Sequence, residues 1–183
     1  KSYFAERGGV TVSGGEPLMQ LDFLIELFTL LKRKNIHTCV DTSGICFDGN
    51  DPRYERLLAL TDLFLLDVKH IGEEAHRELT GRSNEMPLAF ARYLNAHKKP
   101  MWIRHVLVPG LTDDDGALRE LRAFLDTLEC VERVEVLPYH TMGVQKYRAL
   151  GRAYPLEGVQ PPSPERVDNA KRILGAGKYA PKR

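Results

Sequence analysis

The sequence predicts an α/β fold built on a parallel sheet. Short apolar runs alternate with longer segments in which apolar residues recur at helical spacing. Five of the short runs are predicted strands: Val10–Val12, Thr38–Val40, Leu63–Val68, Met101–Val108 and Val134–Leu137. Each ends in a polar or charged group, and the carboxyl ends of parallel strands collect on one rim, where ligands bind. The pattern therefore predicts a site assembled from the whole length of the chain.

The segments between and after these strands predict the helices. Helical spacing is found in Leu21–Lys34, Pro52–Leu60, Pro87–His97, Asp115–Leu128 and Pro164–Leu174. The run Asp113-Asp114-Asp115 can cap a helix near Ala117, and Ser163 can cap the helix that Pro164 begins. Most of the strands are continuously apolar, which is typical of parallel strands covered on both faces.

Composition predicts one domain over residues 1–183. Hydrophobic residues make up 43% of the chain, charged residues 28%, and the net charge is +1. This charge gives no indication of nucleic-acid binding, and no apolar run approaches the ~20 residues that cross a bilayer, so neither partner is predicted. Cys39, Cys46 and Cys130 lack disulfide or metal-ligand spacing. Unpaired cysteines favour a reducing, cytoplasmic location.

Residues 1–9 provide only a short polar stretch before the first predicted strand. A barrel or doubly wound sheet normally begins earlier than this. We therefore expect a partial barrel whose first β/α unit is missing from this chain.

The first strand runs directly into Gly14-Gly15-Glu16-Pro17. Glycines let the backbone approach a ligand closely, and a carboxylate beside them can hold an ammonium group. A tight turn into a helix that Pro17 begins explains the same residues without a ligand.

Two carboxylates, Asp41 and Asp67, end neighbouring predicted strands. On one rim they would repel each other unless a cation or a donor lies between them. Thr42 and nearby carbonyls could complete the oxygen shell of a metal cation. Lys69 points to the same side as Asp67, so a structural Asp67–Lys69 pair is the alternative.

Two more polar residues belong to the predicted rim. Arg104 interrupts an apolar run, so it faces the rim or a carboxylate rather than staying unpaired. His105 has the opposite orientation and is predicted to be structural. His140 ends the fifth strand, where it could contact a ligand or serve a structural role.

These segments resemble the radical S-adenosylmethionine (SAM) enzymes. The stretch from Val10 to Pro17 is similar to their Gly-Gly-Glu motif. The segments 37–44, 61–69, 102–110 and 137–140 resemble one branch, the pyruvate formate-lyase activating enzymes, in order and spacing. The resemblance implies a partial β/α barrel of six units, of which this chain supplies units two to six.

The resemblance also implies a cofactor site. Its cofactor-binding positions are Gly14, Gly15, Glu16, Asp67, Val68, Lys69, Arg104 and His140. Gly14 and Gly15 would line the methionine end of SAM, with Glu16 near its amino group. The positions that hold a monovalent cation, sodium or potassium, are Asp41, Thr42, the Leu65 carbonyl and Asp67.

The activity that the resemblance implies is that of an oxidoreductase. With SAM and a 4Fe-4S cluster, such an enzyme forms a glycyl radical on a partner lyase, here pyruvate formate-lyase, with flavodoxin or ferredoxin as electron donor. The family's Cys-x-x-x-Cys-x-x-Cys cluster motif is absent from this sequence. We therefore predict that this chain alone holds no cluster ligands and is inactive. An activase of another glycyl-radical enzyme and a catalytically dead module that binds SAM or docks a partner are the alternatives.

Overall fold

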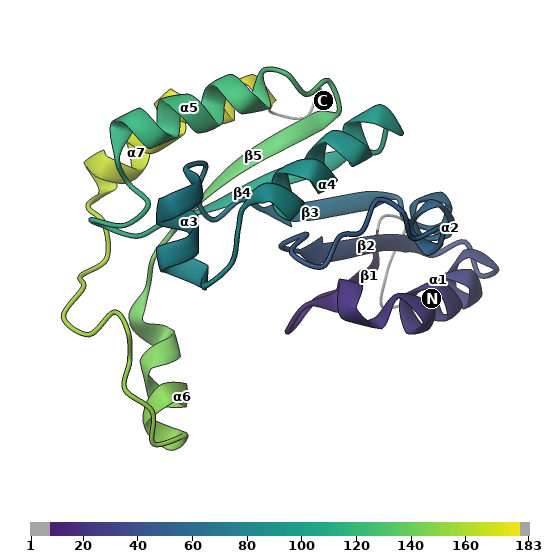
Figure 1. The fold of residues 1–183 in the computed structure, drawn as a ribbon, viewed down its shortest axis with the longest axis horizontal. Coiled ribbons are helices and arrows are strands. Elements are labelled where there is room, and N and C mark those ends of the chain that lie inside the picture. The colour runs from purple at the N-terminus through teal and green to yellow at the C-terminus, as the bar shows by residue number, and fades with distance from the viewer. Residues whose placement is uncertain (1–7, 180–183) are drawn as a thin grey trace.

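A computed structural model describes residues 8–179, and its strands form one parallel sheet (Figure 1). The strands are β1 (Gly9–Val12), β2 (His37–Thr42), β3 (Leu63–Asp67), β4 (Met101–Leu107) and β5 (Val131–Pro138). They lie side by side in chain order, and each pairs in parallel with the next. The predicted α/β class with parallel strands is confirmed.

The helices follow the strands in alternation. They are α1 (Leu21–Lys32), α2 (Arg53–Leu60), α3 (Glu73–Thr80), α4 (Glu85–Ala96), α5 (Asp115–Leu125), α6 (Val144–Ala149) and α7 (Pro164–Leu174). Three 3₁₀ turns are η1 (Pro17–Gln20), η2 (Thr141–Gly143) and η3 (Ala176–Tyr179). The five predicted helices are all present, but α3 and α6 were not predicted. They bury too little for an apolar period to appear, since α3 buries only His76 and α6 buries no residue.

The two predicted helix caps are confirmed. Asp114 Oδ1 accepts a hydrogen bond from the Ala117 N–H at 2.9 Å at the start of α5. Ser163 Oγ accepts one from the Arg166 N–H at 3.2 Å, and Pro164 occupies the first turn of α7. Each cap satisfies a backbone donor that the helix leaves unpaired.

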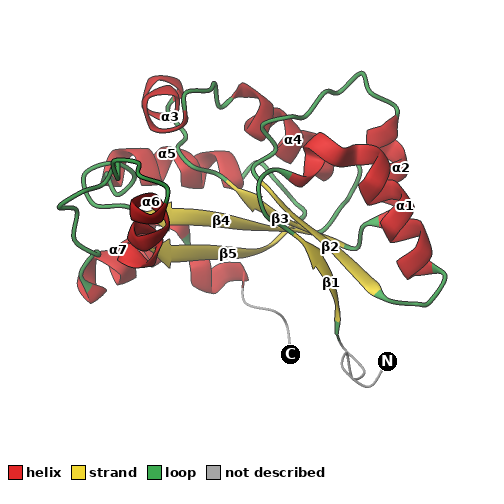
Figure 2. Ribbon diagram, turned by 90° about the horizontal axis from the view of Figure 1, so that it is seen from below, coloured by secondary structure: helices red, strands yellow, loops and turns green. Residues whose placement is uncertain are grey.

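The expectation that helices cover both faces of the sheet is wrong for the described residues. Figure 2 shows α1, α2, α4 and α5 on one side of the strands. Burial alternates accordingly: along β4, Met101, Ile103 and His105 are buried, whereas Trp102 and Arg104 are partly exposed. Apolar residues on both sides of β3 and β4 hid this alternation in the sequence. We call the helix-packed side the covered face and the other side the open face.

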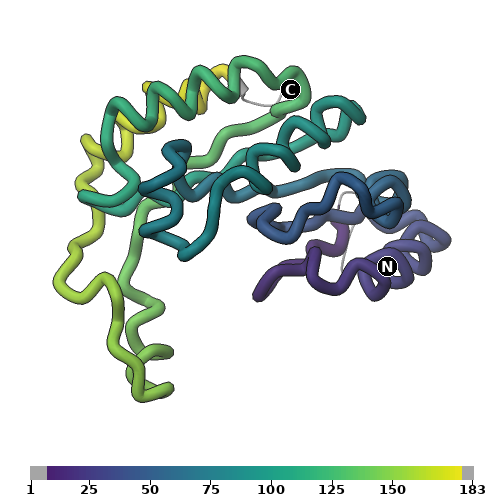
Figure 3. Tube along the Cα trace, in the orientation of Figure 1, coloured from purple at the N-terminus to yellow at the C-terminus, as the bar shows by residue number. Residues whose placement is uncertain are grey.

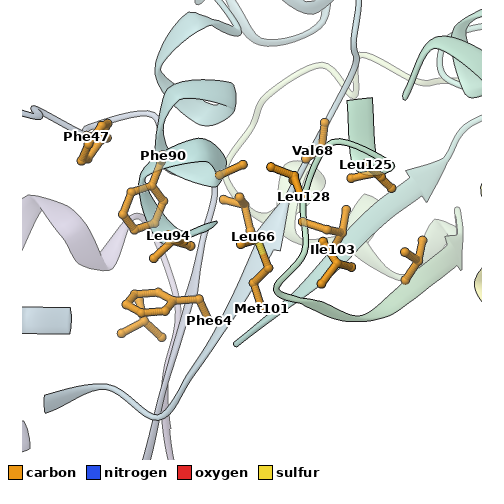
Figure 4. Packing of buried hydrophobic residues seen from close by; sticks show 14 of the residues in the cluster. Phe47, Phe64, Leu66, Val68, Phe90, Leu94, Met101, Ile103, Leu125 and Leu128 are labelled. Atoms are coloured by element: carbon orange, nitrogen blue, oxygen red, sulfur yellow. The ribbon is translucent and has the colours of Figure 1, made fainter. Parts of the chain in front are cut away.

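The main core lies between the covered face and its helices (Figure 4). Phe90 of α4 is fully buried, and its ring lies 5.6 Å from that of Phe64 on β3 and 5.0 Å from that of Phe47. Leu66, Met101 and Ile103 continue the same layer toward β4. This packing holds the strand backbones in register and so fixes where the side chains of the open face emerge.

After β5 the chain leaves the body of the molecule, forms α6 and returns to α7 (Figure 3). Tyr139, at the start of this excursion, and Tyr154, shortly after α6, are joined by a hydrogen bond between their hydroxyl groups at 2.9 Å. The tyrosine pair ties the returning chain to the end of β5. Over residues 8–179, no helix is both long enough and apolar enough to cross a bilayer.

Candidate functional site

The predicted rim residues of β2, β3 and β4 come together on the open face. Asp67 and Arg104 are direct neighbours in the register of β3 and β4. Asp41 pairs in register with Leu65, two residues before Asp67, so both carboxylates point to the same side of the sheet. The two aspartates and the arginine are about one-fifth exposed, with values of 19%, 17% and 22%.

A network of charges joins these side chains. Arg104 Nη1 lies 2.7 Å from Asp41 Oδ2, and Arg104 Nε lies 3.5 Å from Asp67 Oδ1. Lys69 Nζ donates to the second oxygen of Asp67 at 2.6 Å. Ser13 Oγ, at the end of β1, donates to Asp41 Oδ2 at 3.0 Å. Residues from four consecutive strands, or just after them, therefore contribute to one cluster, which we call the rim network: Ser13, Asp41, Asp67, Lys69 and Arg104.

The charges of the rim network stabilise one another. Burial acts to lower the pKa of the Arg104 guanidinium, but the hydrogen bond to Asp41 and the charges of Asp67 and Asp41 outweigh it and raise that pKa. Arg104 is therefore held firmly as a cation between the carboxylates. The Asp67–Lys69 pair that the sequence offered as a structural alternative is present, and it is one part of this larger cluster.

One oxygen of the rim network lacks a partner. Asp67 Oδ1 is buried and accepts no hydrogen bond from any described residue. The nearby Arg104 Nε, at 3.5 Å, is beyond the 2.7–3.2 Å of an ordinary N–H···O bond. Buried carboxylate oxygens are rarely left in this condition unless an ion or water completes them. The donor set, two hard carboxylates with one oxygen free, fits a metal cation.

The Gly-Gly-Glu segment forms an open turn. Gly14 and Gly15 have φ angles of +89° and +54°, and a Cβ atom at either would meet nothing within 4 Å. The glycines are required by this left-handed backbone, and the space beside them is free for a ligand. Both the turn and the ligand interpretations of the segment agree with this geometry.

Glu16 is engaged by the chain itself. Its Oε2 atom accepts from the Ser43 N–H at 3.0 Å and from the Ser43 hydroxyl at 2.6 Å. Its Oε1 atom accepts from the Leu18 N–H at 3.1 Å and from the Thr42 hydroxyl. Glu16 therefore ties the end of β1 to the end of β2 and holds the glycine turn in place. This role of Ser43 was not predicted from the sequence.

Three other predicted residues lie outside the rim network. The Thr42 side chain is buried on the covered face, where its oxygen accepts from the Gly44 N–H at 2.9 Å. Val68 packs into the core, and its backbone N–H and carbonyl are bonded to the Arg104 carbonyl and the His105 ring at 2.9 Å each. His140 is exposed just beyond β5. Their roles toward a cofactor stay predictions.

His105 confirms its predicted structural role. It is buried on the covered face, with Nδ1 2.9 Å from the Val68 carbonyl and Nε2 3.0 Å from the Thr112 carbonyl. Arg104 and His105 are thus adjacent in sequence and serve opposite sides of the sheet.

The cysteines do not provide a cluster site. Cys39 is buried, Cys46 exposed and Cys130 intermediate, all with free thiols. Burial raises the pKa of the Cys39 thiol, and burial followed by the charge of Glu16 raises that of Cys46, whereas iron requires thiolates. Within residues 8–179, no three His, Cys, Asp or Glu residues are grouped so that they could hold a metal ion. These residues therefore do not fit a 4Fe-4S cluster.

Comparison with known proteins identifies the superfamily to which the chain belongs. The family model described as "Radical SAM superfamily" matches residues 2–121. A coproporphyrinogen III oxidase from Escherichia coli, whose structure is described as that of a radical SAM enzyme, shares the fold at a TM-score of 0.64 and 12% identity, over 94% of this chain and 41% of that one. The chain belongs to the radical SAM superfamily. Membership implies SAM and a 4Fe-4S cluster as the cofactors of the reaction.

The relatives then identify the branch of the superfamily to which the chain belongs. A pyruvate formate-lyase-activating enzyme of Streptococcus mutans is 54% identical over 183 residues, which cover 98% of this chain and 69% of that protein. Its counterpart in Listeria monocytogenes is 51% identical over 179 residues, or 96% of this chain and 72% of that protein. A crystallised domain of a pyruvate-formate lyase-activating enzyme from Bacteroides vulgatus superposes with a TM-score of 0.75 at 27% identity, over 91% of this chain and 92% of that one. Within the superfamily, the chain belongs to the pyruvate formate-lyase-activating enzymes.

Proposed function

We propose that the rim network and the glycine turn form the SAM and cation site of an enzyme that activates pyruvate formate-lyase. The convergence of Asp41, Asp67 and Arg104 on the open face carries this proposal. A structural ion cluster would pair every buried oxygen, whereas this one leaves Asp67 Oδ1 without a donor at the predicted ligand position.

The chain's own residues are suited to bind and orient SAM. Gly14 and Gly15 offer unobstructed backbone groups to the amino-acid end of the cofactor, and Glu16 holds their turn against β2. Lys69 and Arg104 supply positive charge for its carboxylate. The further contacts that we propose, from Asp67, Val68 and His140, rest on the family resemblance. When bound, SAM with the reduced cluster supplies the radical that removes a hydrogen atom from a glycine of the partner.

A monovalent cation, sodium or potassium, completes the proposed site. Asp41 and Asp67 would hold it, with oxygens of Thr42 and the Leu65 carbonyl as further ligands. Its place beside the unpaired Asp67 Oδ1 would satisfy that oxygen and reduce the repulsion between the carboxylates.

The names of the relatives support pyruvate formate-lyase as partner over another glycyl-radical enzyme. A flavodoxin or ferredoxin as electron donor and a cytoplasmic location are also part of the proposal. The free thiols of all three cysteines support a reducing compartment.

Replacing Asp41 with Asn tests the cation and cofactor site. In the full-length protein, which also carries the cluster motif, we expect SAM to bind roughly tenfold more weakly and its affinity to lose dependence on potassium or sodium, because one hard anionic ligand is gone. Calorimetric titration with SAM in potassium chloride and in choline chloride measures both effects. Asp168→Asn, which removes the same charge from an exposed site on α7, is the control. Unchanged affinity and salt response in Asp41→Asn would favour a purely structural charge pair.

The second test asks whether this chain can make a radical alone. After anaerobic reconstitution with iron and sulfide, and reduction in the presence of SAM, we expect neither a stable cluster nor release of 5′-deoxyadenosine. The reason is that Cys39, Cys46 and Cys130 do not converge. A polypeptide that also carries the Cys-x-x-x-Cys-x-x-Cys motif should give both, and a glycyl radical on added pyruvate formate-lyase by electron paramagnetic resonance. Product from the 183 residues alone would show that the cysteines assemble in another way.

A further inference from the structure

Arg104 occupies the place between the two carboxylates of the rim network. Its guanidinium is the group that bridges them, at 2.7 Å from Asp41 Oδ2 and 3.5 Å from Asp67 Oδ1. Without a positive charge there, the aspartates would face each other across neighbouring strands and repel. Arg104 therefore does electrostatically what a bound cation would do.

The arginine satisfies the two carboxylates unequally. A guanidinium donates in fixed directions within its plane, and here it makes a short contact to Asp41 but reaches Asp67 only through Nε. Asp67 Oδ1 is left buried without a hydrogen bond. A spherical cation has no such directional limit and can contact oxygens of both carboxylates at once. Arg104 thus holds the Asp41 and Asp67 carboxylates together, but a spherical cation can satisfy the oxygens of both more fully.

We infer that Arg104 and the monovalent cation compete for Asp41 and Asp67. Arg104 holds the carboxylates together while the cation is absent, and cation binding releases the guanidinium to the open face. This inference rests on the cation site proposed above and adds a second state to it. Arg104 is then a positioning residue, which keeps the empty site assembled and offers its donors to an anionic ligand once the cation has replaced it.

The open face gives the released side chain room and a neighbour. Arg104 is 22% exposed on the side of the sheet that α1, α2, α4 and α5 leave uncovered. Glu135 on β5 is its register partner on that side. Glu135 pairs with Arg133 at 3.0 Å, so its carboxylate has a cationic partner before Arg104 is released. It can accept Arg104 as a second partner afterwards. The exchange therefore needs only a side-chain rotation.

Competition predicts the sign of a change in cation affinity. If the cation must displace Arg104, removing the arginine removes a competitor, and potassium should bind more tightly. If Arg104 only supports the ligands, its removal should loosen them and potassium should bind more weakly. Arg104 and potassium are linked because they bind the same two carboxylates. The change in potassium affinity when Arg104 is removed should therefore lie in the range usual for linked binding events, about 5- to 150-fold.

The experiment measures unfolding midpoints against potassium concentration, with choline chloride keeping ionic strength constant. The concentration dependence of the midpoint gives the cation affinity, independently of any overall change in stability. For Arg104→Gln we expect potassium to bind roughly tenfold more tightly than to the unchanged protein. Arg104→Lys keeps the positive charge but lacks the planar set of guanidinium donors, so its potassium affinity should lie between those of Arg104→Gln and the unchanged protein. It replaces Arg104→Gln in the test if that variant does not fold.

Arg133→Gln is the matched control. It removes the same charge from the same open face, where Arg133 is engaged by Glu135 and stacks 4.8 Å from the Trp102 ring. A general loss of positive charge should change potassium affinity by less than about twofold at moderate salt. Equal or weaker potassium binding in Arg104→Gln than in Arg133→Gln would overturn the competition while leaving the cation site standing. Absence of any potassium-specific stabilisation in all the variants would overturn both.

Discussion

The two faces of the sheet are built from alternate residues of the same strands, and they differ in what lies against them. On β3, Phe64 and Leu66 are fully buried under α4 and its neighbours, whereas Leu65 and Asp67 on the other side are partly exposed. The covered face is apolar apart from a few hydrogen-bonded groups such as Thr38 and His105. The open face carries the charges of the rim network. Stability and chemistry are thus separated by the pleat of the strands, one residue apart.

The largest test of this separation compares a large-to-small change on each side. Phe90→Ala should cost about 3–5 kcal/mol, because the ring is fully buried against Phe47, Tyr54 and Phe64 and its loss leaves a cavity. Leu65→Ala on the open face should cost about 1 kcal/mol, since much less area leaves water there on folding. Urea denaturation gives both free energies. Similar losses would show that the open face also contributes to the core.

A second comparison uses the adjacent residues Arg104 and His105. His105→Ala should cost about 2 kcal/mol of stability, because it removes the ring N–H that serves one of the two buried carbonyls, Val68 or Thr112, beside it. It should leave the potassium dependence of stability unchanged, since the ring points away from the rim. Arg104→Gln should show the opposite pattern, with a smaller loss of stability and a changed potassium dependence. A potassium response altered equally in both variants would mean that the two faces are not independent.

The smallest expected effect is a pH dependence arising beyond β3, at His70. Burial lowers the pKa of His70, and its Nδ1 accepts from the Gly72 N–H at 2.9 Å. The unfolded chain therefore takes up a proton at a pH where the folded chain does not. Stability should fall as the pH drops below the usual histidine pKa of about 6.5, by less than the ~1.4 kcal/mol per pH unit that one proton can contribute.

His70→Gln keeps an acceptor but cannot titrate, so its stability should change less between pH 7 and pH 5. Urea midpoints across this range measure the slope. His97→Gln, at the exposed end of α4, is the control. An unchanged slope in His70→Gln would assign the acid sensitivity to another group.

Much of the fold could be predicted because the period of apolar residues is local information. All five strands and five of the helices were found in this way, with Pro164–Leu174 predicted to the residue. The cover on only one face could not be, because Leu63 and Leu65 are apolar and yet only partly buried. Apolar residues of this kind give the same sequence pattern whether a helix covers them or the sheet face is open. The short polar helix α3 was missed for the converse reason, since Ala75 and Leu79 are the only apolar residues within it.

The charged residues of the rim network could be predicted from the sequence, but their pairing could not. Strand alternation placed Asp41, Asp67, Lys69 and Arg104 on one rim. Which carboxylate Arg104 contacts depends on side-chain rotamers and on strand register between residues 63 positions apart in sequence (104 − 41). The same holds for Ser13 and Ser43, whose hydroxyls have no chemical signature until the neighbouring strand ends bring acceptors to them.

The strand order has a consequence for how the chain folds. Because β1 to β5 lie in the sheet in the order in which they occur in the sequence, each strand pairs only with its immediate predecessor and successor. Strand contacts therefore span one β/α unit at a time, which keeps the contact order low for a parallel sheet and reduces the loop entropy lost at each step. A nascent chain can add each unit to the growing edge as it leaves the ribosome, without waiting for a distant segment. The rim network is assembled in the same order: its two carboxylates meet when β3 docks on β2, with Lys69 beside Asp67, and Asp41 gains its cationic partner only when β4 delivers Arg104.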